Sequence, residues 1–412
     1  MTAVRGPRDS IEYLYAVITV ALVIAALLWL TLIYGVSNNV LVALHYNDFG
    51  KFYYAVLHAR HGENLYAPSV ATLIPLSKTV SRQFWDLNPP HFHLLVWPLS
   101  YLPVRQAYIC WTAINVALAG VSLAAVEAEL SLHFSRRTYI VIAFLLLAAA
   151  PTVAWFITGQ LTGILAALGT WIWIELRKER WGRAGIAVGL ACGLKLFLAP
   201  LALYLALRRR WAAVAAAAAA ACVCFVTGAL VFGFGAHREW LAVLRDVQWT
   251  WAAMNASVIA PLARVTVPTA QLAGTSAPSL TLTMSAAVVS LTVLFVGLWA
   301  ATRTRSVDRA VCILYLTCLL SSPLGWVYYH WILIGPGLAT FREHDRRWVY
   351  AACAGLLIPF FLLAFLSVRL AVTVGSVYTW STLLLWMMAV GGAVRGSAGT
   401  GDAGRSAAPA TP

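Results

Sequence analysis

Long apolar segments recur along this chain, and they constrain its fold more than any other feature. Many of these segments approach 20 residues, the length that an α-helix needs to cross the hydrocarbon core of a bilayer. Only 11% of the 412 residues are charged, whereas a soluble domain carries about a quarter. The sequence therefore predicts an all-α polytopic membrane protein.

The net charge of +14 is distributed as membrane insertion requires. Most of the lysines and arginines lie in short loops between apolar segments, as the positive-inside rule describes for cytoplasmic loops. This distribution argues against a nucleic-acid partner. It favours a multi-pass protein of the plasma (inner) membrane with both termini in the cytoplasm.

About 12 membrane helices are expected in a single domain, residues 1–393. The first, 11–34, is interpreted as a retained anchor, because no small-residue cleavage site follows it. Two long outer segments, 35–103 and 234–278, separate groups of helices, and the glycine- and alanine-rich tail 394–412 is expected to be disordered. The other predicted membrane segments lie near 104–130, 138–155, 160–177, 184–207, 211–233, 279–301, 309–325, 327–341, 348–368 and 375–393.

Segment 184–207 has basic flanks at both ends, 177–183 and 208–210. A single crossing would leave one of these clusters outside. A re-entrant hairpin of two short helices, turning between Lys195 and Pro200, keeps both clusters inside. We therefore predict a hairpin. The next predicted membrane segment, 211–233, contains an alanine run at 212–221 that permits close helix packing.

Acidic residues are scarce in the predicted outer segments, and Asp48 is the one at a membrane-helix exit. It precedes an amphipathic run, 48–61, that contains Phe52, Tyr53 and Tyr54. Aspartate is a favoured helix N-cap, and a positioned carboxylate is also a suitable general base. Both interpretations of Asp48 remain open from the residues alone. The other acids in the outer segments are Glu63, Asp86, Glu239 and Asp246.

Lys195 is the only lysine inside a long apolar run. A charge at such a depth costs about 3 kcal/mol or more and usually faces a polar cavity or partner. At a hairpin tip the ammonium could bind a lipid phosphate. Alternatively, the lysine side chain could snorkel to the membrane interface.

Other polar residues lie where apolar segments end on the outer side. Gln160 follows Gly159 at a helix junction, where the glycine could serve only as a turn. In the second outer segment, Asn255, Ser257 and Arg264 are spaced to share one helix face. Arginine binds phosphate in bidentate fashion, and an interfacial arginine is the alternative.

Ser321–Trp331 interrupts a predicted membrane segment on the outer side. Its Trp326 and His330 suit a sugar or a lipid headgroup, and an aromatic belt with a proline break is the alternative. His91 and His93 stand at i and i+2, a poor spacing for helical metal ligands. The seven cysteines fall in or at the edges of apolar runs, so no disulfide framework, structural zinc or other metal is predicted.

Several separated motifs together resemble glycosyltransferase family 87. The similarity covers roughly residues 10–345. The motifs are Asp48-Phe49, Tyr53-Tyr54-Ala55, Gly62–Tyr66, Pro89-Pro90, Trp97–Pro103, Gly159-Gln160, Lys195 with Pro200, Arg208–Trp211, Asn255-Ala256-Ser257 with Arg264, and Ser322–Trp326. Two positions depart from the family pattern: Val327–His330 stands where two histidines often follow the tryptophan, and Asn88 where a tyrosine commonly precedes the prolines.

This resemblance implies a GT-C-type fold and a sugar transferred from a polyprenyl-phosphate donor on the outer face. Family members include α-1,2-mannosyltransferases and arabinofuranosyltransferases, and mannose is the expected sugar here. The acceptor would be a glycolipid or glycan, and membrane lipids would surround the site. The resemblance implies that Asp48 is the catalytic base, and no cofactor is expected besides the donor substrate.

The expected reaction is a direct displacement with inversion. Lys195 and Arg264 would stabilise charge on the leaving phosphate. Gln160, Asn255, Ser257, Trp326 and His330 would bind the sugar or acceptor. Asp86 stays open as a second acid of a retaining route. A lipid-linked sugar transporter or flippase and a non-catalytic scaffold are the alternative functions.

Overall fold

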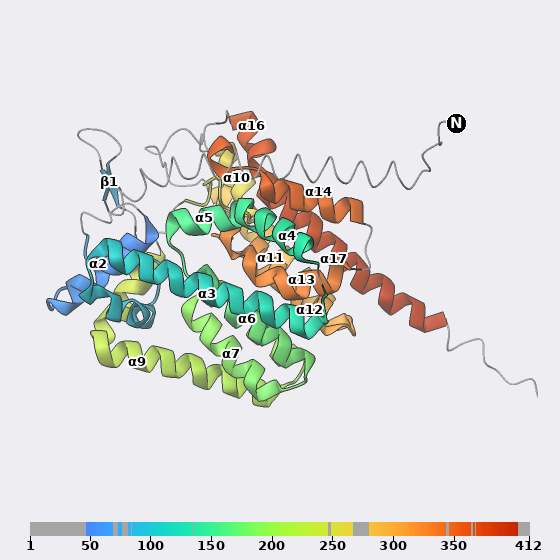
Figure 1. The fold of residues 1–412 in the computed structure, drawn as a ribbon, viewed down its shortest axis with the longest axis horizontal. Coiled ribbons are helices and arrows are strands. Elements are labelled where there is room, and N and C mark those ends of the chain that lie inside the picture. Colours follow the sequence, from blue (N-terminus) through green and yellow to red (C-terminus); the bar gives the residue numbers. More distant parts are fainter. Residues whose placement is uncertain are drawn as a thin grey trace, which may run out of the picture.

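The structure, a computed structural model, describes residues 47–68, 73–75, 81–83, 85–133, 135–245, 249–266, 280–342, 346–363, 366 and 368–402. The predicted first membrane helix, 11–34, lies outside these residues. Helices form nearly all of the regular structure, as predicted (Figure 1).

Among the described residues, the first α-helix is the amphipathic segment and the last one ends at Asp402. The α-helices are α2 (Asp48–Arg60), α3 (Val104–Leu130), α4 (Arg136–Ala148), α5 (Ala150–Thr158), α6 (Thr162–Arg177), α7 (Trp181–Leu194), α8 (Pro200–Leu207), α9 (Trp211–Leu244), α10 (Ile259–Thr266), α11 (Leu280–Arg303), α12 (Val307–Ser321), α13 (Ile334–Phe341), α14 (Arg346–Leu357), α15 (Phe360–Leu363), α16 (Val368–Val372) and α17 (Val377–Asp402). Shorter 3-10 helices join them: η3 (Pro90–Leu95), η4 (Trp97–Tyr101), η5 (Leu196–Leu198), η6 (Val327–Leu333) and η7 (Val374–Ser376).

Four stretches of helix are long and apolar enough to cross a membrane: α3, α9, α11 and Arg369–Arg395. The pair α4–α5, bent by 55°, adds a fifth if the two helices form one span. The protein is therefore a polytopic membrane protein, as its apolar segments predicted. The other described helices are shorter, so the number of 12 membrane helices remains a prediction.

The predicted cytoplasmic loops meet at one end of the bundle. Glu129 at the end of α3 pairs with Arg177, at 3.2 Å, and with Lys178, at 2.8 Å, both at the end of α6. Arg177 also pairs with Asp308 at the start of α12, at 3.0 Å. These charges come from three predicted inner loops. Their contacts support the prediction that the three loops lie on the same side of the membrane.

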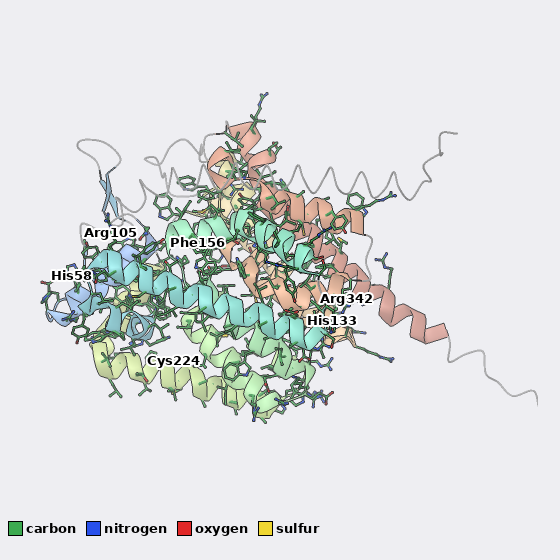
Figure 2. All side chains as sticks on the ribbon, in the orientation of Figure 1. His58, Arg105, His133, Phe156, Cys224 and Arg342 are labelled. Atoms are coloured by element: carbon green, nitrogen blue, oxygen red, sulfur yellow. The ribbon has the colours of Figure 1, made fainter. Side chains whose placement is uncertain are left out.

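Helix α2 lies at the opposite end of the molecule. Figure 2 shows His58 of α2 and Arg105 at the start of α3 on the left, with His133 and Arg342 on the right. The aromatic face of α2 packs inward, where Phe52 meets Phe92 of η3 edge to face, with ring centroids 4.8 Å apart. The described part of the first outer segment also contacts the bundle, because Phe92 and Trp111 of α3 meet edge to face with ring centroids 6.3 Å apart.

Segment 181–210, which includes the predicted hairpin 184–207, folds back so that its two ends meet. Its first residue, Trp181, meets its last, Arg210, whose guanidinium carbon lies 4.1 Å from the indole centroid. Both ends of the segment are therefore together, which a single crossing would not allow. That this hairpin enters the membrane without crossing it remains a prediction. Lys195 stands between α7 and η5 with extended backbone angles, φ −144° and ψ 105°.

Helix α7 packs directly against the alanine-rich part of α9, and the two ribbons lie side by side (Figure 1). A Cβ on Gly185 would lie 2.2 Å from the carbonyl oxygen of Ala213, and one on Gly189 would lie 2.2 Å from that of Ala217. Glycines four residues apart let helix backbones approach closely. The predicted role of the alanine run is confirmed.

Three features differ from the sequence prediction: a pair of strands and the ends of two helices. Strands Leu73–Pro75 (β1) and Ser81–Gln83 (β2) pair antiparallel, so the chain is not purely helical. Helix α9 continues to Leu244, into the predicted outer segment 234–278, because Gly233 at φ 79° absorbs a kink and the helix then resumes. Helix α17 extends to Asp402, into the predicted disordered tail, along a sequence that no proline interrupts.

Candidate active site

Asp48 lies in the first turn of α2, but it is not the residue that caps the helix. The N-cap is Asn47, whose side chain accepts a hydrogen bond from the Gly50 amide at 2.8 Å. The helix-cap interpretation of Asp48 is therefore wrong. The Asp48 side chain is buried, and its carboxylate is available for contacts outside the helix terminus.

Both oxygens of Asp48 accept strong hydrogen bonds. Lys51, one turn further along α2, places its Nζ 2.6 Å from Oδ1. Gln160 donates from Nε2 to Oδ2 at 2.6 Å across the interior of the protein. Charge-assisted hydrogen bonds of this length are the stronger class, so the carboxylate has a fixed orientation.

The Gly159-Gln160 junction explains how Gln160 reaches Asp48. Gly159 ends α5 in the left-handed region, at φ 68°, and its carbonyl accepts a hydrogen bond from Trp111 Nε1 at 2.8 Å. A Cβ on Gly159 would come within 2.7 Å of the Phe49 Cβ. Only glycine fits this backbone conformation and this close approach, which brings the junction against the start of α2.

Tyr329 in η6 connects this carboxylate site to the hairpin tip. Its hydroxyl donates to Gln160 Oε1 at 3.4 Å. Its ring stacks on Phe197 of η5, with centroids 4.9 Å apart, and the Lys195 Nζ lies 5.7 Å from the ring centroid. The structure therefore brings Asp48, Gln160 and Lys195 into one cluster, which we call the Asp48 cluster together with Lys51, Asn88 and Tyr329.

Lys195 has a direct polar partner in the first outer segment. Its Nζ donates to Asn88 Oδ1 at 2.6 Å. Asn88 in turn donates from its amide nitrogen and from Nδ2 to Asp86 Oδ1, at 2.9 and 2.8 Å. His93 Nε2 donates to the other carboxylate oxygen of Asp86 at 2.9 Å.

Asp86 is almost fully buried and remains an acid of low pKa. Burial by itself raises the pKa of this carboxyl. The charge and hydrogen bond of His93, the charge of Lys51 and the backbone amide of Asn88 outweigh burial and hold the pKa below the ordinary 3.8. At neutral pH the Asp86 carboxylate is therefore negatively charged, and it faces the protein.

Lys51, Asn88 and Tyr329 were not among the predicted site residues. Lys51 carried a local signal, since residues i and i+3 of a helix are neighbours and Asp48 stands three positions earlier. Asn88 and Tyr329 coincide with the two departures from the family pattern. Their roles depend on contacts between distant segments, which no local spacing reveals.

The hydrogen bonds of Arg264 lie outside the Asp48 cluster. Its side chain is buried and donates to the backbone carbonyls of Trp251, Ala252 and Asn255, with the Trp251 contact at 2.9 Å. A further donor meets Ser376 Oγ at 2.7 Å. Most of its hydrogen bonds therefore lie within the second outer segment, and the bond to Ser376 joins that segment to η7, just before α17.

Asn255 and Ser257 are buried in the same segment. Asn255 donates from Nδ2 to the carbonyls of Thr250 and Pro323, at 2.7 and 2.9 Å, and accepts from the Ser257 amide at 3.1 Å. Asn255 also forms a backbone bridge with Trp326. Among the described residues, the Ser257 hydroxyl has no hydrogen-bond partner.

Trp326 and His330 flank the tyrosines of η6. The Trp326 ring stacks on Tyr328, with centroids 6.0 Å apart. His330 donates from Nδ1 to the Val327 carbonyl, and its Nε2 contacts the Thr382 hydroxyl, both at 2.8 Å. Within the described part of the chain, no group of three or more histidines, cysteines or acids could hold a metal ion.

These features define a multi-pass membrane protein with a buried carboxylate and a half-buried lysine at the end opposite its basic loops. The profile of glycosyltransferase family 87 matches residues 87–323, more than half of the chain. The chain belongs to glycosyltransferase family 87.

Two curated relatives match part of the chain. A polyprenol-phosphate-mannose-dependent alpha-(1-2)-phosphatidylinositol pentamannoside mannosyltransferase of Mycolicibacterium smegmatis is 30% identical over 159 residues, 38% of this chain and 38% of the relative. An alpha-(1->3)-arabinofuranosyltransferase of Mycobacterium tuberculosis is 31% identical over 180 residues, 41% of this chain and 37% of the relative. The chain thus matches less than half the length of each relative. No solved structure matches it significantly.

Proposed function

We propose that this protein is a membrane glycosyltransferase that moves a sugar, mannose by preference, from a polyprenyl-phosphate donor to a lipid or glycan acceptor. The observation that carries the proposal is the contact of Gln160 with Asp48 and, through Tyr329, its link to Lys195. A base and a cation drawn from distant segments form one buried cluster, in a chain that belongs to a glycosyltransferase family.

In the proposed reaction Asp48 accepts the proton of an acceptor hydroxyl. The hydroxyl oxygen forms a bond to the anomeric carbon, and the bond from that carbon to the donor phosphate oxygen breaks. The phosphate leaves with the electron pair, and the sugar configuration inverts. A positioned general base typically contributes about 10²- to 10⁴-fold to the rate. Gln160 holds the carboxylate in the orientation that this step needs.

Lys195 supplies positive charge for the leaving phosphate in this proposal. A fixed cation in a water-poor site stabilises developing negative charge without reorganisation. Lys51, which pairs with Asp48, contributes a second positive charge nearby. Arg264, by contrast, is proposed to fasten the second outer segment, since it donates to three backbone carbonyls there.

A direct displacement accords with the surroundings of the second acid. A retaining route needs a second carboxyl about 5–5.5 Å from the first that can reach the sugar. The Asn88 amide lies between the Asp86 carboxylate and Lys195, and the Asp86 side chain is 4% exposed. We therefore assign Asp86 no covalent role.

The remaining predicted residues are proposed to bind substrate around this cluster. Trp326 is partly exposed beside Tyr328 and offers an aromatic face to a sugar. Ser257, with an unpartnered buried hydroxyl among the described residues, and Asn255 lie on the same side as Trp326. His330 is proposed to position η6, because both of its ring nitrogens contact protein groups.

The proposed orientation sets the Asp48 cluster on the outer face of the plasma membrane and the termini in the cytoplasm. The basic loops support it, because they gather at the opposite end and cytoplasmic loops are rich in lysine and arginine. The proposed fold is GT-C-type, with the hairpin tip at Lys195 reaching the cluster from the cytoplasmic side.

A second candidate sugar is arabinofuranose. The arabinofuranosyltransferase relative matches a slightly longer stretch than the mannosyltransferase does. The pair Tyr328-Tyr329 also departs from the histidines of the mannosyltransferase-like pattern. The donor assay below separates the two sugars.

The test is sugar transfer by the purified protein in lipid nanodiscs. Polyprenyl-phosphate mannose and polyprenyl-phosphate arabinofuranose are supplied separately, with lipids extracted from the native membrane as acceptors. We expect a glycosylated lipid product from one donor, mannose first. The same protein in sealed proteoliposomes tests transport. Movement of intact donor across their membrane without any product would support a transporter and overturn the proposal.

A further inference from the structure

Next to the Asp48 cluster lies a buried acid that the reaction above does not use. The Asn88 side chain is hydrogen-bonded to Asp86 on one side and to Lys195 on the other. We propose that Asp86 and Asn88 form a bracket that positions the Lys195 ammonium for the leaving phosphate. The inference rests on the proposed function, and it makes Asp86 and Asn88 positioning residues.

The carboxylate of Asp86 determines which way the Asn88 amide points. A carboxylate only accepts hydrogen bonds, so the group facing Asp86 Oδ1 at 2.8 Å must be the amide nitrogen, Nδ2. The amide oxygen then faces the other way, where Lys195 Nζ lies at 2.6 Å. Because a lysine ammonium only donates, this arrangement satisfies all three groups and a flipped amide would satisfy none.

The backbone of Asn88 is fixed independently of Lys195. Its amide nitrogen donates to Asp86 at 2.9 Å, and its carbonyl accepts from the Tyr66 hydroxyl at 2.6 Å. The preceding carbonyl, of Leu87, accepts from Trp240 Nε1 of α9 at 3.1 Å. The bracket therefore rests on both the first outer segment and a long membrane helix.

Asp86 is itself held from the side opposite Asn88. His93 Nε2 donates to Asp86 Oδ2 at 2.9 Å, and the imidazole is fully buried. The Tyr66 and His93 rings also meet edge to face, with centroids 5.9 Å apart. Every side-chain polar atom of Asp86 and Asn88 thus has a partner, which is the condition for a rigid buried network.

Lys195 needs such a bracket because of its place in the fold. It stands at the tip of the hairpin, where α7 has ended and the backbone is extended. A lysine side chain is a point charge on a flexible stem with three rotatable donors. Without a fixed acceptor the ammonium would sample several positions, and a misplacement of about 1 Å can reduce a reaction rate 10²-fold.

The test is a double-mutant cycle on sugar transfer, with Asn88→Ala, Lys195→Met and both together. We expect Asn88→Ala to lower kcat about 10- to 100-fold in the wild-type background. In the Lys195→Met background the same change should alter kcat by no more than about twofold, the limit expected when an interaction has already been lost. KM for the donor should change less than kcat, because the leaving charge develops only in the transition state.

Two variants keep the result interpretable. Gln106→Ala removes an exposed amide side chain at the start of α3, outside the bracket, and it should leave kcat unchanged. Asp86→Leu keeps a side chain of similar size but removes the acceptor that orients Asn88, and it should reproduce the loss of Asn88→Ala. It serves as the second variant if Asn88→Ala is not recovered as folded protein.

Equal losses from Asn88→Ala in both backgrounds would overturn the bracket, since Asn88 would then act independently of Lys195. The proposed function fails in a different way. In that case wild-type protein makes no product, or Lys195→Met transfers sugar at the full rate. The cycle therefore distinguishes failure of the bracket from failure of the glycosyltransferase assignment.

Discussion

Two adjacent residues at the start of α2 divide two roles that sequence alone could not separate. Asn47 caps the helix by accepting from the Gly50 amide, and Asp48 turns both carboxylate oxygens toward Lys51 and Gln160. An acidic residue in the first turn also interacts favourably with the helix dipole. The cap and the candidate base are therefore different side chains.

This division predicts separable effects of mutation. Asn47→Ala removes the cap and should lower the free energy of unfolding by about 1 kcal/mol, while sugar transfer by folded protein stays within about twofold of wild type. Thermal unfolding of the detergent-solubilised protein and the transfer assay measure the two quantities. Loss of transfer without loss of stability would assign chemistry to Asn47 and contradict the division.

Gly159 makes a second residue-scale prediction. In Gly159→Ala the new Cβ would lie 2.7 Å from the Phe49 Cβ and 2.9 Å from the Tyr108 ring, so the junction must move away from α2. Gln160 would then withdraw from Asp48, and we expect kcat to fall about 10- to 100-fold.

The matched control is Gly62→Ala. Gly62 also has a positive φ, 76°, but a Cβ there meets nothing within 4 Å. It reports backbone strain without the clash. Equal losses of transfer in the two variants would show that strain, and not the approach to Phe49, explains the result.

The residues of the site differ in how far the sequence could predict them. Asp48 and Lys195 stand out as charges beside or within apolar runs, and both lie in the cluster. Gln160 follows Gly159, where the positive φ and the close approach of Phe49 require a glycine. Arg264 carries a side chain of a type that binds phosphate, yet it donates to backbone carbonyls and to Ser376. Residue type does not specify which segment folds against a side chain.

At the scale of elements, the hairpin 181–210 was predictable because charge determines which ends must stay together. Two basic flanks cannot lie on opposite sides of a membrane without a cost, and the contact of Arg210 with Trp181 agrees. The kink in α9 was not predictable in the same way. Gly233 adopts φ 79° and lets the helix resume, whereas the same glycine could equally have ended it.

The packing of α7 on α9 gives a prediction at this scale. Gly189→Leu would drive a side chain into the Ala217 carbonyl, 2.2 Å from the modified position. Overpacking typically costs about 1–3 kcal/mol and occasionally more, so we expect less folded protein and a displaced Lys195. Yield of monodisperse protein in detergent and the transfer rate check this.

Gly182→Leu is the corresponding control, because a Cβ at Gly182 of the same helix meets nothing within 4 Å. It should leave yield and transfer close to wild type. If Gly189→Leu behaved like Gly182→Leu, the close contact of the two helices would not contribute to the active fold.

At the scale of the whole molecule, the helices separate two chemically different ends. One end carries the ion pairs of Glu129, Arg177 and Asp308, and the other carries the Asp48 cluster. Such segregation was predictable from the alternation of apolar segments and basic loops. Neither the strand pair of 73–75 and 81–83 nor the packing of η3 could be predicted in the same way, because both depend on contacts within a long polar segment.

The proposed orientation predicts which end is accessible outside the cell. A membrane-impermeant maleimide should label Glu63→Cys in intact cells and Arg209→Cys only after permeabilisation. Both positions are exposed, and the background should lack the two exposed cysteines, Cys222 and Cys353. Labelling of Arg209→Cys in intact cells, with protection of Glu63→Cys, would invert the topology.

The central claim is that Asp48 is the base of a glycosyl transfer, and the most direct measurement compares kcat of wild type with Asp48→Asn. The amide retains the shape of the side chain but cannot accept the proton, so we expect kcat to fall about 10²- to 10⁴-fold. Asp308→Asn is the control, since it removes a partly buried, ion-paired carboxylate at the opposite end and should retain most of the activity. A rate for folded Asp48→Asn within about twofold of wild type would contradict the account.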